Sequence, residues 1–394
     1  MKKIPYGHQR IEKDDIQAVV EVLESPWITQ GPMLKRFEDA LCKYTGAKYA
    51  LCVSSATAAL HIACLAAGIK AQDEVITSSL TFVASANCVL YCGGRPVFAD
   101  IHKDRANIDA EKIEEKITAK TKAIIPVHYA GGPCDLKKIA AIAGKHNLLV
   151  IEDAAHALGA EYNGSKVGSC RYSDMAVFSF HPVKHITTGE GGAVLTNKKN
   201  LYEKLLKLRN HGITKENSKF RIRNSRTSGG WFYEMQELGF NYRLTDFQCA
   251  LGLSQLKKLD NFIKRRREIA GIYNQKLAAV CGIDLPRQNL ECSWHLYSIR
   301  LKEPKRRRDI FEKLHRAGIG AQVHYIPVYF HPYYRKLGYK RGLCPNAEDF
   351  YRRQISIPLY QSMTEQDVNC VIDSIYKIFN ELEKSPEKIR RKRE

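Results

Sequence analysis

The stretch Leu148-Leu149-Val150-Ile151-Glu152-Asp153 is decisive for the fold, because four apolar residues run directly into two acidic ones. An apolar run of this length is typical of a buried strand, and the segment Leu136 to His146 before it has the period of a helix. Similar pairs recur from about residue 48 to residue 200. Alternation of strands and helices predicts an α/β fold, with a mostly parallel sheet covered by helices on both faces.

The alternation can be followed along the chain. Strands are expected at Tyr49 to Ser54, Glu74 to Ser78, Pro96 to Asp100, Ala123 to Val127, Met175 to Phe180 and Gly192 to Thr196. Helices are expected at Ala56 to Ala67, Phe82 to Tyr91, Ala110 to Ile117, Thr245 to Lys258 and Asn261 to Ala279. The segment Thr214 to Gly230 is rich in Ser, Asn, Arg and Gly, which predicts a loop.

The pattern changes after about Gly282, where shorter and more mixed elements begin. A strand at His295 to Leu301, a helix at Arg308 to Ala317, a strand at Ala321 to His324 and a helix at Thr364 to Leu382 are expected there. They indicate a smaller α+β domain, and a chain of 394 residues is long enough for two domains. We therefore expect a large domain at 1–245, a small domain at 246–382 and a basic tail at 383–394.

Composition limits the location of the protein. Its longest apolar runs have strand length, well short of the roughly 18 residues that cross a bilayer. The N-terminus has no apolar segment typical of a signal peptide, so a cytoplasmic protein without membrane contact is expected. The twelve cysteines are scattered without a C-x-x-C pair, and Cys88 and Cys92 lie in a predicted buried helix. This pattern favours free thiols and predicts no metal site.

The net charge of +20 has two interpretations. Lysine and arginine cluster at 264–267, 305–308 and 388–393. A basic surface can bind nucleic acid, but no helix-turn-helix, zinc finger or RNP pattern accompanies it. An anionic small molecule such as a nucleotide diphosphate explains the charge equally well, so charge alone does not identify the partner.

Ligands of an open parallel sheet bind beyond the carboxyl ends of its strands. Ser55-Ala56-Thr57 follows the first strand and opens a helix, where free backbone N–H groups suit a phosphate, although Ser and Thr also cap helices without any ligand. Phe82 follows the second strand, where a core aromatic is the simpler interpretation. Asp153 ends its strand, and an unpaired buried carboxylate is costly, so its side chain must pair or point into a cleft.

Lys184 lies in a loop of Thr and Gly between two apolar strands, an unusual place for a surface cation. A lysine in a dry site loses its proton more easily and becomes a nucleophile for Schiff-base chemistry. Pyridoxal 5'-phosphate (PLP) needs such an amine, a carboxylate for its pyridine nitrogen, a flat group against its ring and a phosphate cup. Lys184, Asp153, Phe82 and the Ser55-Ala56-Thr57 turn supply one each.

With these residues in place, the chain resembles the DegT/DnrJ/EryC1/StrS family of sugar aminotransferases from about Ile4 to the terminal helix. The motifs that carry the resemblance are Trp27-Ile28-Thr29-Gln30-Gly31-Pro32, Ser54-Ser55-Ala56-Thr57-Ala58-Ala59-Leu60, Glu152-Asp153-Ala154-Ala155-His156-Ala157-Leu158-Gly159, Phe178-Ser179-Phe180-His181-Pro182-Val183-Lys184, Arg209-Asn210-His211-Gly212 and Gly239-Phe240-Asn241-Tyr242-Arg243-Leu244-Thr245. The resemblance implies the type I PLP-dependent transferase fold, which is that of aspartate aminotransferase.

The resemblance also implies roles for single residues. Lys184 would bind the cofactor covalently and move the proton between cofactor and sugar. Asp153 would bind the pyridine nitrogen, Phe82 would stack on the ring, and His156 would lie near the cofactor. The phosphate would be held by Ala56, Thr57 and Ser179, joined by Asn241 of the second copy in a homodimer.

The runs around Lys184 and at Ala321-Gln322-Val323-His324-Tyr325 are similar to those of family members that aminate C4 of a UDP-linked 4-keto-6-deoxy-N-acetylhexosamine. L-glutamate would be the amino donor. The residues implied to touch the nucleotide sugar are Tyr6, Pro26, Trp27, Ile28, Thr29, Gln322, Val323, His324 and Tyr325.

Two alternatives stay open from the sequence. The same chemistry could act on another ketosugar, such as a UDP-4-keto-pentose or a GDP- or dTDP-linked sugar. More remotely, a basic protein could use the PLP fold as the sensor of a nucleic-acid-binding regulator. Some relatives have His in place of Lys184 and act as dehydratases, so the lysine favours transamination.

Overall fold

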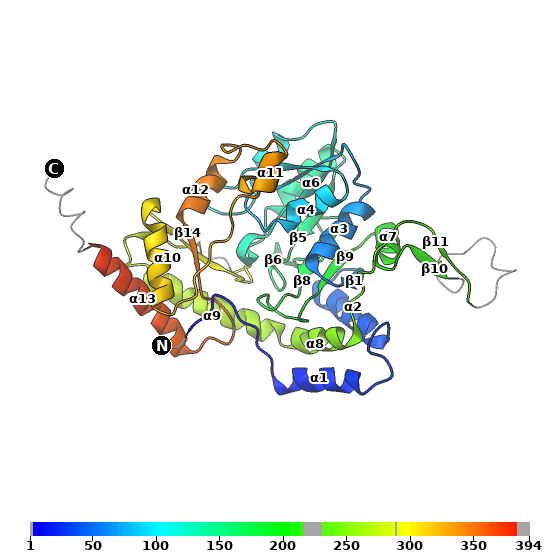
Figure 1. Ribbon diagram of the computed structural model, residues 1–394, viewed down its shortest axis with the longest axis horizontal. Helices are drawn as coiled ribbons and strands as arrows, with labels where there is room; N and C mark the ends of the chain where they lie inside the picture. Colours follow the sequence, from blue (N-terminus) through cyan, green and yellow to red (C-terminus); the bar gives the residue numbers. More distant parts are fainter. Residues whose placement is uncertain (1–2, 216–230, 288–289, 384–394) are drawn as a thin grey trace.

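The computed structural model describes residues 3–215, 231–287 and 290–383, and it confirms the predicted α/β architecture (Figure 1). Its centre is a seven-stranded sheet in the order β1-β9-β8-β5-β4-β2-β3. In that order the strands are β1 (Tyr49–Val53), β9 (Gly192–Thr196), β8 (Met175–Ser179), β5 (Leu149–Asp153), β4 (Thr121–Ile125), β2 (Glu74–Ser78) and β3 (Arg95–Ala99).

The strand directions determine where a ligand can bind. The strands β3, β2, β4, β5 and β8 pair in parallel, whereas β9 pairs antiparallel with both β8 and β1. Hence β1 runs in the same direction as the parallel strands, and only β9 is reversed among the seven. The carboxyl ends of six strands therefore meet at one edge, where a ligand site is expected.

Successive residues of the central strands face opposite layers, as the two-residue period of a strand requires. In β5, Ile151 joins a core with α3 (Ala56–Ala66), α4 (Ala84–Tyr91) and α7 (Lys199–Arg209). Val150 faces the other layer and packs in a core with α5 (Ala110–Glu114) and α6 (Leu136–Lys145). Burial on both faces explains why these strands are apolar throughout.

A second group of helices covers the β1–β9–β8 end of the sheet. The helices α2 (Pro32–Thr45) and α8 (Asp246–Lys257) pack against each other there and share a core with β8 and β9. On the outside of α8 lies α1 (Lys13–Leu23), which Figure 1 shows below it.

The C-terminal part forms a separate antiparallel sheet with its own core. Its strands are β12 (Ile283–Asp284), β13 (Tyr297–Leu301) and β14 (Gln354–Ile357). The helices around this core are α9 (Leu259–Leu277), α10 (Arg307–Arg316) and α13 (Glu365–Glu383). Along α9, Ile263 packs in the core beside the large sheet and Ile269 in the small one, so this helix joins the two. The domain boundary after residue 245 stays a prediction.

Short elements complete the described chain. They are the hairpins β6 (Glu161–Tyr162)–β7 (Ser165–Lys166) and β10 (Ile213–Lys215)–β11 (Tyr233–Met235), the helices α11 (Pro332–Lys336) and α12 (Pro345–Arg353), and the 3-10 turns η1 (Tyr129–Gly131), η3 (Pro304–Arg306) and η4 (Val328–Phe330). All twelve cysteines are free thiols. No helix within the described ranges is both long and apolar enough to span a membrane.

One sequence prediction of local structure is wrong, and a second differs from the structure at its first two residues. The strand expected at Ala321 to His324 is reduced to one bridge between Gln322 and Ser356, because the backbone N–H of His324 donates instead to the side chain of Gln354 at 3.0 Å. The loop expected at Thr214 to Gly230 begins as part of β10, where Thr214 pairs with Glu234. Residues 216–230 of that loop, like the tail 384–394, lie outside the described residues.

Gly192 is required where β9 passes the start of α3. A Cβ atom at this position would lie 2.6 Å from the backbone nitrogen of Ala56 and 2.6 Å from the carbonyl carbon of Ser55. Backbone atoms at the end of a strand and the start of a helix cannot move aside cheaply. The glycine therefore allows the helix N-terminus to approach the sheet edge.

We predict that Gly192→Ala lowers the free energy of unfolding by about 1–3 kcal/mol, the usual cost of overpacking a tight interior. Gly144→Ala in α6 is the matched control, because a Cβ atom there meets nothing within 4 Å and alanine favours a helix. Thermal unfolding of both variants measures the difference. Equal melting temperatures would contradict the close approach of β9 and α3.

Candidate active site

A cavity of about 520 Å³ lies at the carboxyl edge of the large sheet. Eleven of the sequence-predicted site residues line it: Tyr6, Ala56, Thr57, Phe82, Asp153, His156, Ser179, Lys184, Gln322, His324 and Tyr325. They come from six separate regions of the chain. The fold therefore brings together residues that the sequence predicted singly.

The two acidic residues at the end of β5 have different surroundings, because adjacent strand residues face opposite layers. Glu152 is buried and pairs with His128 at 2.8 Å. Asp153 lies on the cavity wall, where its Oδ2 accepts a hydrogen bond from the Ser85 hydroxyl at 2.6 Å and its Oδ1 accepts one from the backbone N–H of Ala155 at 3.1 Å. These two donors hold the carboxylate of Asp153 in a fixed orientation.

The start of α3 forms a second wall. Ser55 is the N-cap residue, and its hydroxyl accepts a hydrogen bond from the N–H of Ala58 at 3.1 Å. The N–H groups of Ala56 and Thr57 belong to the first turn, where no intrahelical acceptor exists, and the helix dipole is positive there. Ser179, the last residue of β8, lies on the same cavity. A phosphate group would find donors and a favourable field at this place.

Lys184 lies on the cavity wall in the turn that follows β8, where its backbone N–H donates to the carbonyl of His181. Burial lowers its pKa to about 8 from the usual 10.5, although Asp153 opposes that change and Arg266 adds to it. The Nζ atom lies 3.4 Å from Nε2 of His295. A substantial fraction of this amine is therefore neutral near physiological pH, as a nucleophile or proton acceptor requires.

Three buried histidines surround Lys184. The rings of His156 and His295 lie 4.3 Å apart between centroids, and His185 lies 5.6 Å from His295. Burial, with nearby positive charge, holds the pKa of each well below the ordinary histidine value, so all three are neutral. Their Nδ1 atoms have no hydrogen-bond partner among the described residues. The neutral imidazoles of His156 and His295 thus line the cavity beside the Lys184 amine, and His185 lies next to His295.

The segment Gln322 to Tyr325, from the C-terminal part of the chain, forms another wall of the cavity. The Tyr325 hydroxyl and Nε2 of His156 lie 3.0 Å apart, and the Tyr325 ring lies 6.1 Å from that of Phe82. The Nδ1 atom of His324 lies 2.9 Å from the hydroxyl of Ser356, and burial lowers the pKa of His324 to about 4. Both side chains are held by packing and hydrogen bonds before any ligand binds.

Six predicted residues do not line this cavity. Pro26, Trp27, Ile28 and Thr29 lie between α1 and α2, Asn241 is exposed beside Asn210, and Val323 is half-buried between Gln322 and His324. Trp27 and Ile28 are 58% and 51% exposed, which is unusual for large apolar side chains. Their predicted roles require a second copy of the chain or a bound substrate.

The structure also adds residues that the sequence analysis did not select. His295 and Ser85 contact Lys184 and Asp153, and Thr81, His181 and Glu190 line the cavity. Ser85 was hidden within a stretch interpreted as a buried helix. His295 begins a segment interpreted as a strand of the small domain, and no local signal connects it with Lys184 more than a hundred residues away.

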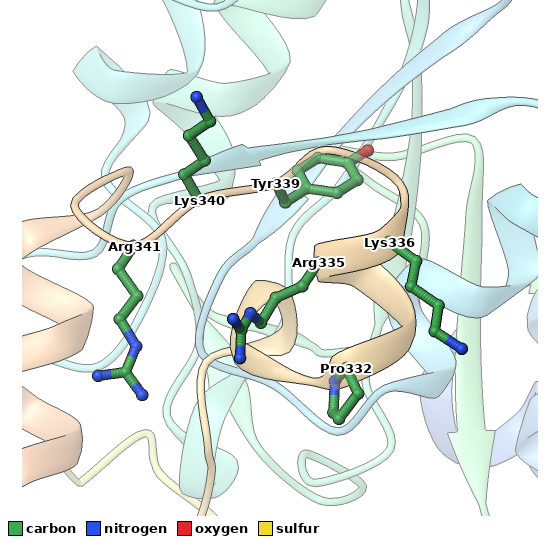
Figure 2. A pocket seen from close by; sticks show the side chains of 6 residues that line it. All are labelled: Pro332, Arg335, Lys336, Tyr339, Lys340 and Arg341. Carbon is green, nitrogen blue, oxygen red and sulfur yellow. The ribbon is translucent and has the colours of Figure 1, made fainter.

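A second hollow, of about 620 Å³, has none of this chemistry. It lies beside α11 and is lined by Pro332, Arg335, Lys336, Tyr339, Lys340 and Arg341. Figure 2 shows the two lysine side chains pointing away from the two arginines. No Asp, Glu, His or Cys is among its six lining residues, so it is a basic surface rather than a candidate active site. We call it the basic lobe.

The residues of the 520 Å³ cavity fit PLP. The α3 N-terminus with Ser179 can hold its phosphate, the fixed carboxylate of Asp153 can pair with its pyridine nitrogen, and Lys184 offers a partly neutral amine. Phe82, at the cavity and 56% exposed, offers a flat face. Within the described ranges, no group of three or more His, Cys, Asp or Glu side chains is arranged to hold a metal ion.

Comparison with known proteins shows the family of this chain. Residues 9–376 match the DegT/DnrJ/EryC1/StrS aminotransferase family. The chain is 42% identical to the spore coat polysaccharide biosynthesis protein SpsC of Bacillus subtilis, over 94% of this chain and 96% of the relative. It is 41% identical to a UDP-4-amino-4,6-dideoxy-N-acetyl-beta-L-altrosamine transaminase of Campylobacter jejuni, over 97% of this chain and 99% of the relative.

Solved structures give the same result. PseC of Helicobacter pylori, an aminotransferase of pseudaminic acid biosynthesis, superposes with a TM-score of 0.89 at 37% identity, covering 96% of this chain and 100% of the other. Another structural neighbour, a sugar aminotransferase, was solved in its PLP-form. The predicted cofactor and enzyme class are confirmed: this chain belongs to the DegT/DnrJ/EryC1/StrS aminotransferase family and is a PLP-dependent sugar aminotransferase.

Proposed function

We propose that the protein transfers the amino group of L-glutamate to C4 of a UDP-linked 4-keto-6-deoxy-N-acetylhexosamine, giving UDP-4-amino-4,6-dideoxy-N-acetyl-β-L-altrosamine. The observation that carries the proposal is the meeting of the Lys184 amine, the Asp153 carboxylate and the α3 N-terminus at one cavity. The substrate itself is inferred from the names of the Campylobacter and Helicobacter relatives.

The bound cofactor supplies an electron sink and a carrier for the amino group. The residues of this chain do the rest. Asp153, oriented by Ser85, would keep the pyridine nitrogen protonated, and Lys184 would remove and return the proton at the amine-bearing carbon. His156 and His295 are neutral, so neither would compete with Lys184 in donating a proton to the substrate. Tyr325 lies over the cavity, next to His156.

The active protein is proposed to be a homodimer with shared sites. The large apolar side chains of Trp27, Ile28 and Phe82 are more than half exposed, although all three are implied to touch cofactor or substrate. A second copy would cover them and bring Asn241 to the phosphate. Sedimentation velocity checks the dimer, and a monomer with full activity would contradict it.

A cytoplasmic location is proposed on the same grounds, since sugar-nucleotide substrates and free thiols fit that compartment. The nucleic-acid alternative gains no support, because the basic lobe has no accompanying recognition motif. The alternative that the substrate is another ketosugar stays open, since SpsC is as similar to this chain as the altrosamine transaminase is.

Replacing the cofactor lysine is the first test. We predict that Lys184→Ala folds normally, lacks the yellow absorption band of bound PLP that bleaches with glutamate, and loses turnover by about a thousandfold or more. Lys112→Ala, at an exposed lysine of α5, is the matched control and should keep band and turnover. A band that survives glutamate in the unaltered protein would point to another donor or to a dehydratase.

The pH dependence of cofactor capture tests the surroundings of Lys184. Only the neutral amine attacks the cofactor aldehyde, so the capture rate of the PLP-free protein should rise with pH and level off above about 8. Stopped-flow absorbance with added PLP measures it. A rate that keeps rising towards pH 10.5, the ordinary lysine value, would contradict a dry site around this amine.

A panel of ketosugars tests the substrate. We predict that kcat/KM for the UDP-linked 4-keto-6-deoxy-N-acetylhexosamine exceeds that for UDP-4-keto-pentose and for dTDP- and GDP-linked ketosugars by about tenfold or more. Mass spectrometry of the aminated products measures it. A higher kcat/KM for any other sugar would leave the enzyme class intact and replace the proposed substrate.

A further inference from the structure

A further cavity, of about 390 Å³, lies between the large sheet and the C-terminal core and is open to solvent at its rim. Its inner wall has three aromatic side chains, Tyr129, Trp294 and Phe350, each at most 7% exposed. Tyr129 and Phe350 meet edge to face with centroids 5.7 Å apart, so their rings are fixed. Its size and apolar lining are typical of small-molecule sites.

The rim of this cavity is basic. Arg105, Arg287 and Arg300 line it, against the single carboxylate of Asp104. Asp104 pairs with Arg287 at 2.9 Å. In the described part of the chain, no carboxylate lies within ion-pair distance of Arg105 or Arg300. Two guanidinium groups are thus available to an anion, and their forked donors match phosphate or carboxylate oxygens.

The rim is also pre-organised across the two domains. Arg300 is held on β13, between β12 and β14, and its Nη1 donates to the carbonyl of Lys103 at 3.1 Å. The Arg287–Asp104 pair is a second contact with the same loop, because Asp104 follows Lys103 directly. Both contacts join the C-terminal part to the loop after β3, so Arg287 and Arg300 are already held at the rim before a ligand binds.

This cavity is separate from the active site, although one layer of side chains divides them. The Tyr129 hydroxyl donates to the carbonyl of His324 at 2.7 Å, and Ser298 is linked through Ser356 to Nδ1 of the same His324. Tyr129 and Ser298 face this cavity, whereas His324 faces the active site. A ligand here could therefore bind while PLP occupies its own site.

We infer that the 390 Å³ cavity is a second ligand site for an organic anion with a flat ring, the class to which nucleotides belong. The ring lies against the aromatic wall of Tyr129, Trp294 and Phe350, and the anionic group binds Arg105 and Arg300 at the rim. The inference does not depend on which sugar the active site takes.

Trp294 provides the test, because it is one of only three tryptophans and the other two, Trp27 and Trp231, are 58% and 81% exposed. In a PLP-loaded protein carrying Trp27→Phe and Trp231→Phe, the remaining fluorescence comes from the cavity wall. AMP is the probe, since an adenine nucleotide differs from the proposed uridine substrate. We expect AMP to quench this fluorescence saturably, and adenosine or inorganic phosphate to do so about tenfold more weakly.

Two pairs of substitutions locate the binding. Arg105→Gln with Arg300→Gln should weaken AMP binding by about tenfold or more, because each removes a charge-assisted hydrogen bond. Arg335→Gln with Arg341→Gln in the basic lobe is the matched control and should leave it unchanged (Figure 2). The inference is overturned if AMP does not quench, if quenching survives the cavity pair, or if the control pair removes it. Equal quenching by phosphate alone would also overturn it, by removing the role of the ring.

Discussion

The guanidinium of Arg266 is the constraint on which the site depends. This side chain is fully buried in α9, and its Nη1 donates to the carbonyls of Trp294, His295 and Leu359 at 3.0–3.3 Å. Its Nη2 donates to the side-chain oxygen of Gln361 at 2.9 Å. None of these partners is an anion, so no carboxylate compensates the buried charge of Arg266. Burying an unpaired charge costs stability, so we expect this charge to have a role in the site.

The charge of Arg266 contributes to the pKa values of the groups around it. Burial lowers the pKa of Arg266 only to about 9, so the guanidinium stays charged at neutral pH. Its charge adds to burial in lowering the pKa values of Lys184, His185 and His295. The anions of the reaction, a cofactor phosphate and a substrate carboxylate, would meet this positive charge in a cavity whose lining includes two carboxylates, Asp153 and Glu190. The same cation thus joins α9 to the segments around Trp294 and Leu359, and it helps to keep the Lys184 amine partly neutral.

The sequence predicted the parts of this structure that depend on local periodicity. Strands β2 and β9 have the predicted bounds, and Asp153 and Lys184 lie where the strand ends placed them. The pair Glu152–Asp153 shows the limit of such reasoning. Alternation separates the two carboxylates, but only the fold reveals that His128 satisfies one and Ser85 orients the other. The failed strand at Ala321 to His324 has the same origin, because a distant amide on Gln354 ended its ladder.

Contacts between distant segments explain the remaining differences. His295 meets Lys184 because Arg266 holds the carbonyl before it and the one of His295 itself, an arrangement that spans three regions of the chain. Residues such as Trp27 and Asn241, in contrast, were selected by resemblance and are exposed in one copy. Periodicity indicates which face of an element is buried within its own chain, and it carries no information on surfaces that a second copy would cover in the proposed homodimer. The single chain accordingly brings together the amine of Lys184, the carboxylate of Asp153 and the α3 N-terminus, whereas Trp27, Ile28 and Asn241 stay exposed.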